Sequence, residues 1–472
     1  MKRYMTGALG TLVTAALCLP VVAYAQVVED FTPTKVTLDT GVLVGNMDNG
    51  VRVFRGVPYA KPPVGELRWQ APEMPDAWPG ERLALADEPP CPQPVNPDGG
   101  TPNGGGVTGV QSEDCLYLTA FAPAKAEKAP VVLWMYGGAG FLGAGHLGSY
   151  NGTSNAKAGV VTFAMNYRLG ALANFNHPAL SKAAGKNEPL GNFALTDAVA
   201  ALQWIQRNAE AFGGDPNNVT IAGQSAGGLM VVNLLSVPSA EGLYHKAVIQ
   251  SGAFLQPAQS LQDAEQKGAG AMTTMGLPKD TTAEQLRAVS AQSFIYNEAT
   301  RRGVGSPIDG RFRTVSTGEA LDAGNEIDVP VLIGSNSGEG GFSGARDIAR
   351  KTGDDGANAW LYHFAYVPSF RQKEWKNGAI HSAELMFTFD SMATSGWARS
   401  ANGTVNDEDR AVAKRVHSCW VAFYKMSPSA DAFTCAEGVE WPSYSESGDA
   451  TMLFTREAEI VKSNTLPAGE EG

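Results

Sequence analysis

One stretch predicts the fold: Asn218-Val219-Thr220-Ile221-Ala222-Gly223-Gln224-Ser225-Ala226-Gly227. It is typical of a strand, a sharp turn and the start of a helix. The turn has the pattern Gly-x-Ser-x-Gly. The backbone two residues on either side of the serine is crowded there, and only residues with little or no Cβ avoid the clash. The turn presents the serine hydroxyl at the N-terminal end of the next helix, where unpaired N–H groups favour developing negative charge. Ser225 is therefore the candidate nucleophile, although a chain with 54 glycines also produces such patterns by chance.

The sequence around this turn predicts an α/β fold with a mostly parallel sheet covered by helices. From about residue 130 onward, short β-branched or apolar runs alternate with longer amphipathic stretches. One helix is expected over residues 195–212, ending at Gly213-Gly214-Asp215-Pro216. Before residue 120 the chain is rich in proline and glycine, which suits a small N-terminal antiparallel subsheet and surface loops. The other strands are expected at residues 131–135, 160–164, 247–250 and 329–333.

The first 25 residues have the features of a secretory signal peptide. Lys2 and Arg3 precede an apolar run over about residues 8–22, and Ala23-Tyr24-Ala25 forms a small-x-small cleavage site. We therefore expect a secreted or periplasmic protein in which residues 26–472 form one domain. No later stretch approaches the ~20 apolar residues of a membrane span, and a net charge of -12 makes a nucleic acid a poor partner.

Four cysteines follow the expected cleavage site: Cys91, Cys115, Cys419 and Cys435. An even number of cysteines in an exported chain suggests two disulfides, for which three connectivities exist. The sequential pairing closes the shortest loops, so we expect Cys91 to pair with Cys115 and Cys419 with Cys435. Four free buried thiols are the alternative.

Several further segments occur in the order of one known family. They are Phe54-Arg55-Gly56-Val57-Pro58-Tyr59-Ala60, Ser112-Glu113-Asp114-Cys115-Leu116-Tyr117-Leu118, Asn166-Tyr167-Arg168-Leu169-Gly170, Ser306-Pro307-Ile308-Asp309-Gly310 and Trp441-Pro442-Ser443-Tyr444, with shorter matches at 62–65, 67–69 and 134–138 and a long one at 191–228. In these motifs the chain resembles the type-B carboxylesterases, the family that includes the cholinesterases. The resemblance implies an α/β-hydrolase fold and a serine esterase that acts on small-molecule carboxylic esters through an acyl-enzyme.

The resemblance also implies the partners of Ser225. The family places the acid in a Gly-rich turn after a strand, here Gly334-Ser335-Asn336-Ser337-Gly338-Glu339-Gly340, which makes Glu339 the acid. The base matches the GxxHxxE segment at 378–384, which makes it His381. Serine, acid and histidine then follow in the order of α/β-hydrolases. His146, the alternative near the oxyanion loop, precedes the serine and would break that order.

The oxyanion donors follow from a residue-by-residue match with the family. The N–H groups of Gly138, Ala139 and Ala226 are expected to receive the negative charge that develops on the substrate oxygen. Small residues suit these positions, because the substrate carbonyl must approach the main chain closely.

Three departures from the family bear on the substrate. Gln224 stands where many members carry glutamate, Gly140 stands where an aromatic residue is common, and residues 92–114 contain no tryptophan for binding a quaternary ammonium. Only 42 positions separate Glu339 from His381, far fewer than in typical members, so the lid region is shortened. We expect an open pocket that accepts bulky or aryl esters.

Two other functions are compatible with the resemblance. A non-catalytic binding or adhesion domain, as in the neuroligins, would have lost the catalytic residues. A lipase would need an apolar lid. The sequence has no HExxH or paired CxxC metal motif and no phosphate-binding GxxxxGK motif, so we expect neither metal nor cofactor, and the oligomeric state stays open.

Overall fold

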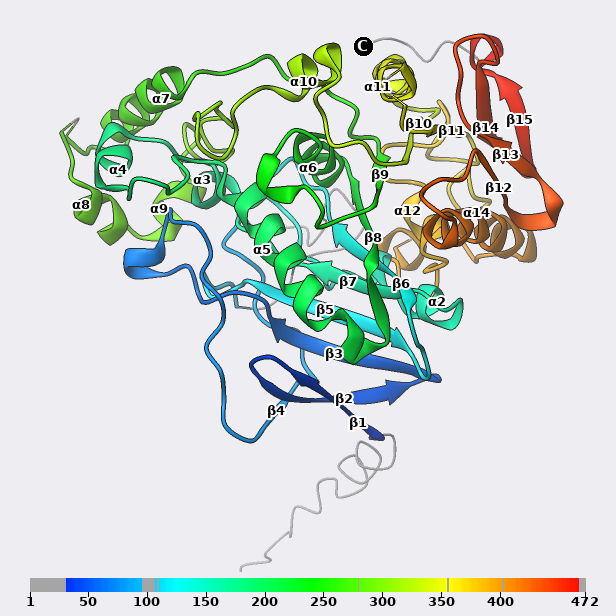
Figure 1. Ribbon diagram of the computed structural model, residues 1–472, viewed down its shortest axis with the longest axis horizontal. Helices are drawn as coiled ribbons and strands as arrows, with labels where there is room; N and C mark the ends of the chain where they lie inside the picture. Colours follow the sequence, from blue (N-terminus) through cyan, green and yellow to red (C-terminus); the bar gives the residue numbers. More distant parts are fainter. Residues whose placement is uncertain are drawn as a thin grey trace, which may run out of the picture.

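One sheet of 13 strands runs through the molecule (Figure 1). The computed structural model describes residues 31–95, 107, 110–278, 280–354, 356–400 and 403–466, so the expected signal peptide lies outside the described residues. The sheet order is β1-β2-β3-β5-β7-β6-β8-β9-β10-β11-β14-β15, with β4 beside β2 and a separate pair of β12 and β13. The strands are β1 (Pro33–Leu38), β2 (Gly41–Asp48), β3 (Val51–Pro58), β4 (Glu81–Leu83), β5 (Tyr117–Pro123), β6 (Ala129–Met135), β7 (Val161–Met165), β8 (Gly214–Gln224), β9 (Lys246–Gln250), β10 (Val331–Asn336), β11 (Ala359–Phe364), β12 (Ala432–Thr434), β13 (Glu440–Pro442), β14 (Ala450–Phe454) and β15 (Ala458–Lys462).

The two ends of this sheet differ in strand direction. From β7 to β14 each pair of neighbours is parallel, whereas β1, β2, β3 and β5 pair antiparallel, and β5 joins β7 antiparallel. The expected mostly parallel sheet is confirmed. The expected N-terminal antiparallel strands are present as a direct continuation of the main sheet, and a further antiparallel strand, β15, lies at the opposite edge.

Helices cover both faces of the sheet. On β7, Thr162 accepts a hydrogen bond from Asn155 of α2, whereas the next residue, Phe163, packs edge-on against Trp204 of α5. Successive residues of a strand point to opposite faces, so α2 and α5 lie on opposite sides. The helices are α2 (Thr153–Lys157), α3 (Gly170–Ala173), α4 (Pro178–Ala183), α5 (Phe193–Asn208), α6 (Ala226–Leu234), α7 (Leu261–Thr274), α8 (Ala283–Ala288), α9 (Ala291–Ile295), α10 (Thr317–Ala323), α11 (Phe342–Asp354), α12 (Leu385–Thr388), α13 (Gly396–Arg399) and α14 (Asp407–Lys425), with 3₁₀ turns η1 (Gly65–Leu67), η2 (Gly148–Tyr150), η3 (Ala209–Phe212), η4 (Pro238–Ala240), η5 (Ala436–Gly438) and η6 (Ser463–Thr465).

Helices α11 and α14 also lie on opposite faces of the sheet. Tyr362 on β11 packs against Trp420 of α14, and its neighbour His363 packs against Phe342 at the start of α11. The buried Lys246 of β9 donates to two main-chain carbonyls at the end of α14, and burial lowers the pKa of this amine to about 7.

Element boundaries follow from local chemistry. The helix expected over 195–212 is α5, which begins at Phe193 and passes into the 3₁₀ turn η3, as helix ends often do. The strand expected from residue 329 begins at Val331, because Pro330 has no N–H to donate to the sheet.

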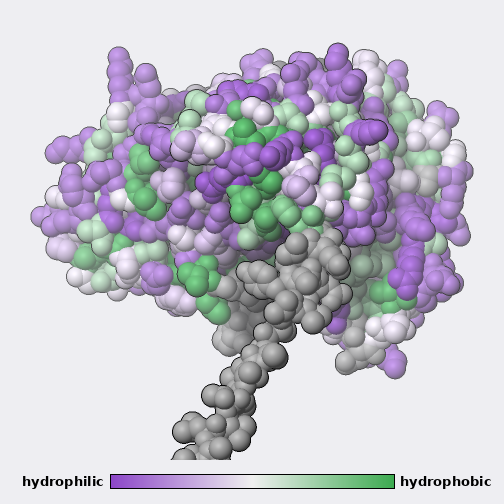
Figure 2. Space-filling view, turned by 90° about the horizontal axis from the view of Figure 1, so that it is seen from below, coloured by the Kyte–Doolittle hydropathy of each residue, from purple (hydrophilic) through white to green (hydrophobic). Residues whose placement is uncertain are grey.

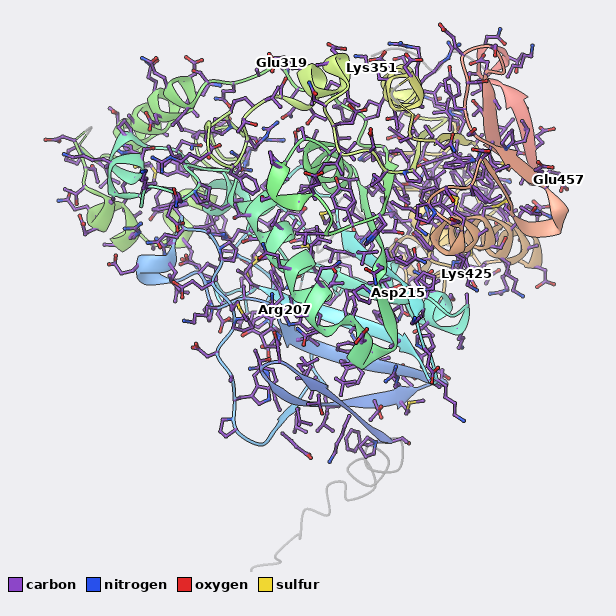
Figure 3. All side chains as sticks on the ribbon, viewed as in Figure 1. Arg207, Asp215, Glu319, Lys351, Lys425 and Glu457 are labelled. Carbon is purple, nitrogen blue, oxygen red and sulfur yellow. A yellow bond between two sulfur atoms is a disulfide. The ribbon has the colours of Figure 1, made fainter. Side chains whose placement is uncertain are left out.

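Covalent and ionic links join distant parts of the chain. The structure has the disulfides Cys91–Cys115 and Cys419–Cys435. Arg207, labelled in Figure 3 near the end of α5, pairs with Asp39 at 2.7 Å and so ties α5 to the turn between β1 and β2. Lys351 of α11, also labelled there, pairs with Asp322 of α10 at 2.7 Å.

The surface seen from below is largely hydrophilic, with several separate hydrophobic groups (Figure 2). Within the described ranges, no helix is both long and apolar enough to cross a membrane.

Candidate active site

The turn around Ser225 is held by close backbone packing. Ser225 has φ 56° and ψ -121°, a conformation rare for a residue with a side chain, and its N–H donates to the Gln250 carbonyl at 2.8 Å. A Cβ on Gly223 would lie 2.4 Å from the Gly227 carbonyl, and a Cβ on Gly227 would lie 2.0 Å from the Met135 carbonyl oxygen. Both glycines of the Gly-x-Ser-x-Gly pattern are therefore required sterically, as the sequence predicts.

The hydroxyl of Ser225 is available for chemistry. Ser225 occupies the N-cap position of α6, but its side chain makes no capping hydrogen bond. The residue is partly exposed and lines a cavity of ≈ 340 Å³. The hydroxyl thus lies at the positive end of the α6 dipole and is not used to cap the helix.

The expected oxyanion turn packs directly against the serine. A Cβ on Gly137 would lie 2.8 Å from the Ser225 Cβ. The turn then runs through Gly138, Ala139 and Gly140 with φ values of 126°, 53° and 74°. Among the described residues, no hydrogen-bond partner takes the N–H groups of Gly138, Ala139 or Ala226. Ala139 and Ala226 line the same cavity as Ser225.

The structure brings Glu339 and His381 into direct contact, although 42 positions separate them. A Glu339 carboxylate oxygen contacts the imidazole Nδ1 of His381. The other oxygen accepts the N–H of Asn336 at 2.8 Å and the hydroxyl of Ser251. Glu339 therefore holds the proton on Nδ1, which leaves Nε2 as a free base.

The Nε2 atom of His381 faces the turn that carries the serine. It lies 3.3 Å from the side-chain nitrogen of Gln224, the residue before Ser225. With the proton on Nδ1, Nε2 accepts a hydrogen bond from that amide. Within the part of the chain that the structure describes, no hydrogen bond joins His381 to the Ser225 hydroxyl.

Two carboxylates set the electrostatics of His381. Burial lowers the pKa of His381, but the hydrogen bond and charge of Glu339 and the charge of Glu384 outweigh it and raise the pKa above its usual value. Burial, followed by the charge of Glu339, raises the pKa of Glu384 to about 7. The Glu384 carboxylate accepts from the amides of Gln250 at 3.1 Å and Asn336 at 2.5 Å.

The cavity beside Ser225 draws its walls from several segments. One is the oxyanion turn, and others come from α5, α6 and the chain that follows α9. Phe254, 53% exposed, lines it as well. His146, the alternative base, does not line this cavity; the charges that act on it belong to Asp87 and Arg55.

Sequence reasoning missed three residues of this site: Ser251, Glu384 and Arg302, which lines the cavity. Ser251 directly follows β9, the parallel neighbour of the strand that leads to Ser225. Parallel strands bring their carboxyl ends to one edge of a sheet, so this position indicates a residue near the nucleophile. Glu384 lay in the GxxHxxE segment without an assigned role. No sequence signal marked Arg302.

Comparisons with known proteins identify the family of the chain. The family model described as "Carboxylesterase family" matches residues 32–352. The para-nitrobenzyl esterase of Bacillus subtilis (strain 168) is 30% identical over 495 residues, covering 90% of this chain and 95% of that protein. The fumonisin B1 esterase of Sphingopyxis macrogoltabida is 35% identical over 335 residues, covering 70% and 60%. A solved structure of a PNB esterase superposes with a TM-score of 0.80 at 29% identity, covering 92% of this chain and 98% of the other.

Proposed function

Because the chain belongs to the carboxylesterase family, and is therefore a carboxylic-ester hydrolase, we propose that Ser225, His381 and Glu339 form its catalytic triad. The observation that carries the proposal is the position of the paired Glu339 and His381, whose free Nε2 contacts the residue next to Ser225. The cavity beside the serine supplies room for a small-molecule ester.

The proposed reaction has two halves. His381 Nε2 takes the proton of Ser225 as Oγ attacks the ester carbonyl carbon, and it then gives that proton to the departing alkoxide. Water repeats the attack on the acyl-enzyme, with His381 again as base, and releases the acid and Ser225. For the first transfer, Nε2 exchanges its contact with the Gln224 amide for one with Ser225; such contacts are often loose in unliganded enzymes.

We assign stabilisation of the tetrahedral intermediate to the N–H groups of Gly138, Ala139 and Ala226. Their freedom from protein partners among the described residues supports this role. Loss of one such donor typically costs about 3 kcal/mol of transition-state stabilisation.

Covalent labelling tests the nucleophile. A fluorescent organophosphonate should add one adduct to the wild-type protein, visible as a single intact-mass shift, and none to Ser225→Ala. Ser306→Ala removes another serine that lines the cavity and should keep the label. An adduct on Ser225→Ala would refute the assignment.

We also propose that the pocket is open enough for bulky or aryl esters. The short connection between Glu339 and His381 and the exposed Phe254 support this. Purified protein should hydrolyse naphthyl butyrate as readily as naphthyl acetate and p-nitrophenyl acetate. Turnover restricted to p-nitrophenyl acetate would contradict the open pocket.

Export to the periplasm or medium is a further proposal, which the two disulfides support because such bonds persist in oxidising compartments. N-terminal sequencing of the mature protein should begin at Gln26. A cytoplasmic protein that retains Met1 would contradict export.

A further inference from the structure

The cavity beside Ser225 contains one charged side chain among the described residues that line it. That side chain is Arg302, and no aspartate or glutamate is in the lining. Arg302 is exposed, so a ligand in the cavity can reach its guanidinium. A substrate therefore meets a positive charge and no negative one on the walls of this cavity.

The Arg302 guanidinium is held in place without a carboxylate. Its central carbon lies 4.6 Å from the centre of the Phe141 ring, and Arg301 approaches the same ring at 5.7 Å. The N–H of Phe141 donates to the carbonyl of Gly138, so the ring that both guanidinium groups contact belongs to the oxyanion turn. Across the ranges that the structure describes, neither arginine forms an ion pair. The Nε of Arg301 is buried and has no hydrogen-bond partner among the described residues.

A third arginine lies behind the wall of the cavity. The buried Arg313 donates to the Ser306 hydroxyl at 3.0 Å and to the Asn233 side-chain oxygen at 3.0 Å, and both residues line the cavity. The nearby Asp309 accepts main-chain N–H groups with its two oxygens, and its negative charge acts on the Arg313 guanidinium without a direct hydrogen bond between the two side chains. Arg313 therefore orders the wall of the cavity, and Arg302 alone of the three arginines presents its charge to a ligand there.

We propose that the cavity contains a carboxylate subsite, in which Arg302 binds a free carboxylate carried by the ester substrate. The preferred substrates are then esters with an acid group, such as half-esters of dicarboxylic acids. A guanidinium supplies two parallel N–H donors that match the two oxygens of a carboxylate, and the π-face contact with Phe141 leaves its N–H edges free. This inference rests on the proposed role of Ser225, because the subsite is defined relative to that hydroxyl.

Matched pairs of substrates test the subsite. In 4-acetoxybenzoate the leaving phenol carries a carboxylate, and in its methyl ester the same phenol carries a neutral ester group. Mono-4-nitrophenyl adipate and its methyl ester provide the same contrast on the acyl side. The quantity measured is the ratio of kcat/KM for the acid to kcat/KM for its methyl ester. Comparing this ratio between variants cancels differences in intrinsic reactivity within a pair.

In at least one pair, Arg302→Gln should lower the ratio about tenfold, the effect of losing one hydrogen bond to a charged group in a solvent-exposed position. Arg302→Lys should retain part of the ratio. Arg399→Gln, a change to another exposed arginine that does not line the cavity, should leave it unaltered. In the wild-type protein, added NaCl should raise KM for the acid more than for its methyl ester.

The outcomes separate the two proposals. An unchanged ratio in both pairs for Arg302→Gln, with hydrolysis still dependent on Ser225, overturns the subsite and leaves the triad intact. An equal fall in Arg399→Gln also overturns it, because the effect would then come from overall charge. Hydrolysis that survives Ser225→Ala refutes the triad instead. Thermal unfolding of each variant shows that the fold is retained.

Discussion

Two regions supply the candidate active site, and they are held together in different ways. Around Ser225 the geometry is enforced by main-chain packing, where Gly223 and Gly227 leave no space for a Cβ against the elbow itself and against the end of β6. Around His381 it is enforced by side-chain hydrogen bonds between distant segments, such as Ser251 to Glu339 across 88 positions and Gln250 to Glu384 across 134. The first region has a short, contiguous sequence pattern, whereas the second joins segments that only the finished fold brings together.

Ser225→Ala should give the largest effect on activity. The elbow places the hydroxyl without using it structurally, so we expect kcat to fall about a millionfold with little change in the unfolding temperature. Steady-state kinetics and differential scanning calorimetry on the same samples check both parts. A strong loss of stability would show that the hydroxyl also supports the turn.

Gly227→Ala should break the local region through packing. Because the added Cβ would lie 2.0 Å from the Met135 carbonyl oxygen, we expect the free energy of unfolding to fall by about 3 kcal/mol, together with most of the activity. Gly270→Ala is the matched control, since it lies in α7 with nothing within 4 Å of the added Cβ and should stabilise the protein by about 0.5–1 kcal/mol. Urea unfolding measures both, and equal stabilities would contradict the steric account.

Ser251→Ala should weaken the distant network without unfolding the protein. It removes one donor to Glu339, and the resulting loss of orientation at His381 should lower kcat about tenfold while KM stays nearly constant. Ser391→Ala serves as the control. It also removes a buried hydroxyl, but this hydroxyl donates to the main-chain carbonyl of Ser149, so kcat should stay unchanged. A rise in KM alone would argue against a positioning role.

Glu384→Gln should produce the smallest change, visible in the pH profile. In the proposed triad His381 must be neutral to act as base, so we expect activity to fall as pH drops through its pKa. Glu339 and Glu384 raise this pKa above its usual value of 6.5 despite the opposing effect of burial. Removing the Glu384 charge lowers that pKa, and the acid limb of kcat/KM should move to lower pH. Because His381 and Glu384 influence each other's protonation, the apparent pKa of the acid limb describes both groups together. An unmoved limb, or one moved to higher pH, would contradict this electrostatic account.

The contrast between the two regions explains which features the sequence predicted. Strand β8, the glycines around Ser225 and helix α5 follow from local pattern and steric demand, and the structure contains each of them. The pairing of β5 with β7, which merges the antiparallel and parallel parts into one sheet, depends on which strands become neighbours, and periodicity does not carry that information. Ser251 and Arg302 are not predicted for the same reason, since Ser251 contacts Glu339 and Arg302 contacts Phe141 only in the folded protein.

The outermost strands of the sheet bear on how the protein behaves at high concentration. An unpaired strand edge is a template for aggregation unless charge or proline blocks it. β1 begins with Pro33 and exposes Lys35, and β15 exposes Glu459 and Lys462. The charges at both edges and the missing N–H group of Pro33 therefore disfavour edge-to-edge pairing with another sheet.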